Sequence, residues 1–68
     1  MDFIKTLETT QFGHFHIELQ VYEDEDGDYL YNISIVCDTG LDIFESYYKE
    51  KAQAYYNELI DNIKRSNR

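Results

Sequence analysis

Two segments with alternating polarity, separated by a short acidic stretch, are the strongest constraint on the fold. In GHFHIELQVYE, apolar and polar residues alternate from Phe15 to Val21, which is the period of a strand with one buried face. YLYNISIVC repeats this period from Tyr29 to Cys37. Neither segment contains proline, and both are rich in β-branched and aromatic residues. They are therefore predicted to be the two strands of an antiparallel hairpin.

The length of the hairpin loop decides which residues face each other. A two-residue loop would pair Val21 with Asn32 and place the two apolar sets on opposite faces of the sheet. A three-residue loop at positions 25 to 27 instead pairs Val21 with Tyr31, so that both sets share one face. It also puts Gly27 where a left-handed backbone is required, which glycine tolerates best. We therefore predict the three-residue loop.

The segment KEKAQAYYNELIDNIKR has apolar residues at three- and four-residue spacings and is predicted to be an amphipathic helix. Asp61 and Arg65 are expected to pair four residues apart. The start of the helix can be interpreted in two ways. Residues 42–48 either extend the helix backwards or form a further strand. The second interpretation is supported by IFESYY, which is rich in strand-preferring residues. The N-terminal FIKTLETT is expected to supply another strand, because a lone hairpin is marginal in water.

These elements predict an α+β fold in a single domain spanning residues 1–68. We expect an antiparallel meander of three, or with the alternative above four, strands, with one C-terminal helix packed on one face. A chain of this length buries only about 60% of its unfolded surface, so a spacious active-site cavity is not expected. The face predicted to lie under the helix consists of Phe15, Ile17, Leu19, Val21, Tyr31, Ile33 and Ile35. Tyr55 and Tyr56 are expected to join this core.

The charge balance limits the partners of the chain. Six basic and 14 acidic residues give a net charge of −8, which disfavours nucleic acid and anionic lipid and favours basic partners. No leader-like segment and no run of about 18 apolar residues occurs in the sequence, so a cytoplasmic protein is expected. The single cysteine, Cys37, is predicted to be a small buried core residue beside Phe15, without a basic neighbour to activate the thiol.

The acidic stretch VYEDEDGDYLY is the main candidate for a functional surface. It does not fit an EF-hand loop, because placing Gly27 at the sixth position puts Tyr22 first and Ile33 twelfth, where carboxylates are required. A turn needs one aspartate rather than five carboxylates, which favours a binding role. We expect no metal and no cofactor here. The predicted partner-binding residues are Glu18, Tyr22, Glu23, Asp24, Glu25, Asp26 and Asp28.

No pattern of catalytic residues accompanies these carboxylates. The sequence has no Ser-His-Asp order, glycine-rich phosphate loop or HExxH segment, so no enzymatic activity is expected. His14 and His16 alternate on one strand face, with Asp38 as the one further candidate ligand, and are expected to be ordinary polar-face residues. Tyr22 and Leu30 are predicted to face each other on the outward side of the hairpin. They are either a binding patch or covered by the N-terminal strand or a second copy.

Two functions follow from these features. The first is a non-enzymatic inhibitor that binds a basic, nucleic-acid-binding protein by presenting carboxylates in place of phosphates. In size, acidity and β-plus-helix organisation, the chain resembles small phage-encoded anti-defence proteins, including anti-CRISPR proteins that mimic DNA. This resemblance is one of overall character and carries over no individual residue. The second function is a cytoplasmic interaction or regulatory module that works as a homodimer, in which the acidity is incidental.

Overall fold

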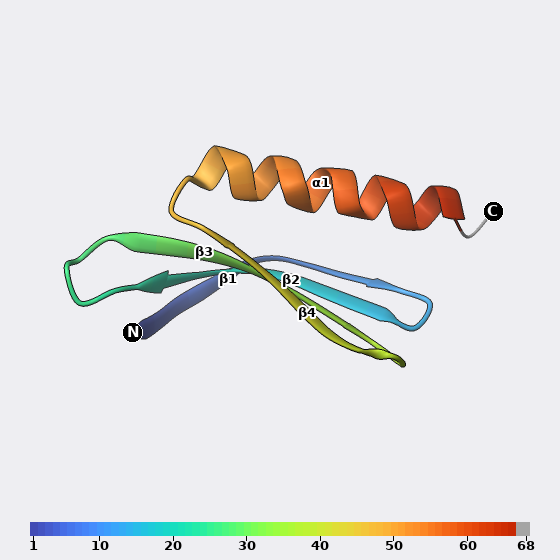
Figure 1. The fold of residues 1–68 in the computed structure, drawn as a ribbon, viewed down its shortest axis with the longest axis horizontal. Helices are drawn as coiled ribbons and strands as arrows, with labels where there is room; N and C mark the ends of the chain where they lie inside the picture. The colour runs from blue at the N-terminus through green and yellow to red at the C-terminus, as the bar shows by residue number, and fades with distance from the viewer. Residues whose placement is uncertain (67–68) are drawn as a thin grey trace.

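Four consecutive strands form one antiparallel sheet, and a C-terminal helix covers one of its faces (Figure 1). This arrangement comes from a computed structural model of the protein, which describes residues 1–66. The strands lie in the order β1-β2-β3-β4. Their bounds are β1 Asp2–Phe12, β2 Phe15–Glu23, β3 Tyr29–Cys37 and β4 Gly40–Ser46, and the helix α1 spans Lys49–Ser66. The predicted α+β fold is confirmed, with four strands and with the N-terminal segment as β1.

The hairpin of β2 and β3 has the predicted register. Val21 lies opposite Tyr31, and the remaining apolar pairs continue along the same face of the sheet. The loop is closed by a hydrogen bond from the Asp24 N–H to the Asp28 carbonyl, at 2.9 Å. Gly27 has a φ of 84°, which is the left-handed conformation expected of the glycine in such a loop.

Residues 42–48 do not belong to the helix, so the reading in which α1 begins near Asp42 is wrong. Strand β4 pairs with β3 along its whole length and satisfies backbone groups that β3 would otherwise leave free. The chain then turns at Ser46, whose Oγ accepts a hydrogen bond from the Tyr48 N–H at 3.1 Å. The first helical bond runs from the Ala52 N–H to the Tyr48 carbonyl. The side chain of Ser46 thus helps to fix the connection between β4 and α1.

The core lies between the sheet and the helix. It consists of Ile17, Leu19, Ile33, Ala52, Tyr56 and Ile63, with partly buried apolar side chains around it. The Tyr56 hydroxyl is satisfied by the Oγ1 of Thr10 on β1, at 2.6 Å. This bond connects the helix to the far edge of the sheet. Among residues 1–66, no helix combines the length and the apolar character needed to cross a membrane.

Strand β1 is irregular at two places. Its register against β2 shifts between Phe3 and Lys5 and again between Thr6 and Glu8, so that Ile4 and Leu7 are extra residues on the β1 side. Such bulges bend a strand and increase its twist. Leu7 packs against the core, whereas Ile4 is exposed. The alternation of FIKTLETT is therefore interrupted although the segment is a strand.

Two residues expected in the core lie at its margin. Tyr55 is 38% exposed and stacks on Phe44 of β4, with ring centroids 4.1 Å apart. Cys37 is only half-buried, because it ends β3 at the turn before β4. Its Sγ lies 3.2 Å from the Thr39 hydroxyl, and this hydrogen bond lowers the pKa of the thiol without a basic neighbour. Tyr56 is buried as predicted, and Tyr31 is half-buried against the core.

Candidate functional site

The loop between β2 and β3 is built around the side chain of Asp24. Its Oδ1 accepts hydrogen bonds from the backbone N–H groups of Asp26 and Asp28, both at 2.9 Å. The Asp24 carbonyl also accepts from the Gly27 N–H, at 3.1 Å. One of the carboxylates in this loop therefore has a structural role, since it organises the turn that presents the others.

The acidic tip, defined here as Glu23, Asp24, Glu25, Asp26 and Asp28, concentrates negative charge in a small volume. One carboxylate oxygen from each of Asp24, Asp26 and Asp28 can be chosen so that all three lie within 4.8 Å of one another. Calcium takes six to eight oxygen ligands, and this group offers three, of which Asp24 Oδ1 already accepts two backbone hydrogen bonds. The arrangement fits a concentrated anionic surface better than a calcium site.

A further carboxylate reaches this end of the molecule from the N-terminus. Asp2 lies directly opposite Glu23 in the pairing of β1 with β2. Sequence reasoning missed it because the two bulges in β1 hide the register that brings Asp2 to the tip. Within residues 1–66, no salt bridge joins Asp2 or the acidic tip to a cation.

Tyr47 connects the acidic tip to the segment before the helix. The pKa of Asp24 is lowered chiefly by the backbone N–H of Asp28, and in addition by a hydrogen bond from the Tyr47 hydroxyl. The same hydrogen bond raises the pKa of Tyr47. The ionised form of Asp24 is thus the form that the folded tip stabilises.

Acid is expected to weaken the tip through Asp24. Because its pKa in the folded chain lies below the ordinary value of 3.8, its stabilising effect is complete above that value and is lost as the pH falls through the folded pKa. Asp24→Asn keeps an acceptor oxygen for the turn but cannot titrate. Urea unfolding midpoints measured from pH 7 down to pH 2 should therefore fall more steeply for the wild type than for Asp24→Asn. Parallel profiles for the two proteins would contradict this role.

Two predicted site residues, Glu18 and Tyr22, do not belong to the acidic tip. Both lie on the face of the sheet opposite the helix, in a row of hydrogen-bonded side chains. Glu18 accepts from the His16 ring at 2.9 Å and from Gln20 at 2.8 Å, so its carboxylate is already engaged. Its strand position is about 17 Å from Glu23, five residues at roughly 3.4 Å each. Glu18 is therefore separate from the acidic tip and does not add to its cluster of carboxylates.

Tyr22 is covered by the N-terminal strand, which was one of the two predicted alternatives. It faces Leu30 as expected, but its ring makes an edge contact with Phe3 of β1, with centroids 5.5 Å apart. Its hydroxyl donates to Gln20 at 3.2 Å. Tyr22 is half-buried by these contacts, so only part of its side chain is available to a partner.

The two histidines do not face a common ligand. His14 lies 3.4 Å from Asp38, the predicted cross-strand neighbour, in an exposed pair at the far end of the sheet. The ring of His16 is held between Gln11 and Glu18, at 2.8 Å and 2.9 Å. Each imidazole is thus engaged separately, as expected of polar-face residues.

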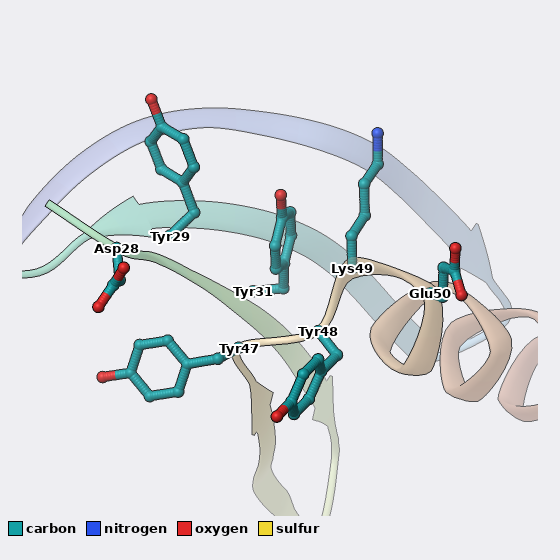
Figure 2. Close-up of a pocket in the computed structure, with 7 residues that line it drawn as sticks. All are labelled: Asp28, Tyr29, Tyr31, Tyr47, Tyr48, Lys49 and Glu50. Carbon is teal, nitrogen blue, oxygen red and sulfur yellow. The ribbon is translucent and has the colours of Figure 1, made fainter.

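A groove lined by tyrosines lies beside the acidic tip (Figure 2). This tyrosine groove, of about 620 Å³, is formed by Tyr29, Tyr31, Tyr47, Tyr48, Asp28, Lys49 and Glu50. Three of its tyrosines are more than half exposed: Tyr29 by 52%, Tyr47 by 54% and Tyr48 by 66%. Sequence reasoning did not identify the groove, because its residues come from β3, the β4–α1 connection and the start of the helix.

Comparison with protein-family models, curated proteins and solved structures finds no match for this chain.

Proposed function

We propose that the protein is a non-enzymatic inhibitor or binding protein that engages a basic, nucleic-acid-binding protein through its acidic tip. The observation that carries the proposal is the set of six carboxylates at one end of the molecule, the acidic tip and Asp2, none of which forms a salt bridge within residues 1–66. Like charges held this close repel each other, so a cationic partner would gain interaction energy without breaking an existing ion pair.

The distribution of charge along the molecule supports a directional surface. The chain measures 43 × 22 × 15 Å, and the helix runs from beside the β2–β3 loop toward the opposite end (Figure 1). Lys64 and Arg65 lie in its last turn, away from the acidic tip, whereas Lys49 lies near it and lines the groove beside Asp28. A basic partner would be attracted to the acidic tip by its five clustered carboxylates rather than by a separation of charge along the whole molecule.

The proposal includes competition with nucleic acid for a cationic surface. The aspartates of the acidic tip are clustered, and the carboxylate of Glu18 is engaged elsewhere, so the charges that would compete form a cluster and not a row along a strand. A cluster of this kind would occupy the pocket of one or two phosphates in a basic site. Under this proposal, DNA or RNA and the protein exclude each other from the partner.

The test is affinity capture from a lysate of the producing cells and of the cells they encounter. The bait is the wild type, or a variant with Glu23, Asp24, Glu25, Asp26 and Asp28 changed to Gln or Asn. A matched control changes five exposed carboxylates elsewhere, Glu8, Asp42, Glu45, Glu58 and Asp61, in the same way. Wild type and control should capture a basic nucleic-acid-binding protein that short DNA or RNA displaces. The tip variant should lose it.

The dependence of binding on salt distinguishes this function from that of a homodimeric interaction module. Binding through the acidic tip should weaken by about tenfold or more between low and high salt, because exposed charges are screened. Equal capture by the tip variant and the matched control would overturn the proposal. So would capture that persists at high salt and is not displaced by nucleic acid.

The second candidate, a homodimeric interaction module, has one observation in its favour. The face opposite the helix exposes Val36, Leu41 and Ile43 by 46%, 60% and 55%, on β3 and the edge strand β4. An exposed apolar edge of this kind is a template for pairing with a second chain. Sedimentation equilibrium at micromolar concentration would then show a dimer that persists at high salt and dissociates in a Leu41→Lys, Ile43→Lys variant.

A further inference from the structure

We propose that the tyrosine groove binds an arginine side chain of the basic partner. This inference rests on the proposed function and specifies its chemistry, since it distinguishes guanidinium from ammonium. The volume of about 620 Å³ lies within the range of about 300–1,000 Å³ typical of ligand sites, although the groove is open on one side. It therefore suits a side chain that projects from another protein.

The tyrosine groove combines aromatic faces with carboxylates. Figure 2 shows Asp28 and Glu50 at opposite ends, with the tyrosines between them. The one lysine that lines the groove, Lys49, extends alongside Tyr31 and away from Asp28 and Tyr47. Its ammonium group is thus directed away from the part of the groove that borders the acidic tip.

One ring of the groove already receives a cation. The Nζ of Lys51 lies 4.9 Å from the centroid of the Tyr48 ring, within the range of a cation–π contact. Lys51 thus occupies one face of Tyr48, and an arginine of the partner would stack on another exposed ring, that of Tyr29 or Tyr47. Tyr47 lines the groove together with Asp28, so the groove is continuous with the acidic tip.

Guanidinium fits this combination better than ammonium. Its planar group stacks on aromatic rings, donates hydrogen bonds in a fork that matches carboxylates, and is less strongly hydrated than an ammonium group. Lysine would be attracted by the same charges but would gain less from the rings. The groove is therefore expected to select arginine over lysine, whereas the acidic tip alone attracts both.

The experiment compares two peptides of equal length and charge, one with four arginines and one with four lysines, titrated against the full chain by NMR. The wild type should bind the arginine peptide at least about threefold more tightly. A Tyr47→Leu, Tyr48→Leu variant should weaken the arginine peptide by about five- to thirty-fold and remove the preference. Both side chains are more than half exposed, so no core contact is lost. A Tyr47→Phe, Tyr48→Phe variant keeps the rings and should keep the preference.

The variant with a neutralised acidic tip makes the two proposals separable. If it loses both peptides while the leucine variant binds both as the wild type does, the proposed function stands and the arginine groove is overturned. If arginine is preferred and the leucine substitutions remove that preference, the groove is supported whatever the tip variant does. Equal affinity of the wild type for both peptides overturns the arginine groove.

Discussion

Ile33→Ala is expected to lower the free energy of unfolding by about 2–5 kcal/mol, measured by urea denaturation. Ile33 is fully buried at the centre of the sheet, with Leu19 and Phe44 opposite it on the two neighbouring strands. Truncation would remove apolar contacts and leave a cavity beneath the helix. A domain of this length has a total stability of only about 3–10 kcal/mol, so the substitution would remove a large fraction of it.

Ile43→Ala is the matched control, because it makes the same chemical change on the adjacent strand. Ile43 is exposed on the opposite face, so its loss should cost less than about 1 kcal/mol. Similar losses in the two variants would contradict the assignment of the core face. A loss at Ile43 that grows with protein concentration would instead support self-association through that face.

The register of the central hairpin was predictable because two independent rules agree on it. Alternation requires Val21 and Tyr31 to face the same side, and the left-handed conformation of Gly27 fits the loop length that this pairing imposes. Residues 42–48 were not predictable in this way. Ile43 and Phe44, and then Tyr47 and Tyr48, are adjacent apolar pairs that suit either a helix or a strand with apolar side chains on both faces. Only the pairing of β4 with β3 decides between them.

The candidate site was predictable only where it is local in sequence. The acidic tip is one continuous stretch, and the hairpin register places it at one end of the molecule. Asp2 reaches it through a strand whose bulges break the alternation. The tyrosine groove depends on how the β4–α1 connection folds back beside β3, which no spacing in the sequence encodes. The sequence predicts Glu18 as part of the anionic surface and Tyr22 as an aromatic contact beside the acidic tip, but it does not show that neighbouring side chains engage both.

Ala52→Asp is expected to detach the helix or unfold the chain, because it places a carboxylate at a fully buried position between helix and sheet. An unpaired buried charge costs several kcal/mol, which is comparable with the whole stability of this domain. Far-UV circular dichroism and urea titration at pH 7 should show loss of helix and of the cooperative transition. Because burial disfavours the charged form, the new carboxyl would have a raised pKa, and part of the loss should be recovered as the pH falls below it.

Ala54→Asp adds the same charge two residues further along the helix, at an exposed position. Its cost should be close to the difference in helix propensity, about 0.5–0.7 kcal/mol. If the two variants were equally stable, the helix would not be packed as described. The comparison of Ala52→Asp with Ala54→Asp also tests the tyrosine groove, because helix packing holds Tyr48 and Glu50 near Tyr29 and Asp28. A variant with a detached helix should therefore lose the preference for arginine.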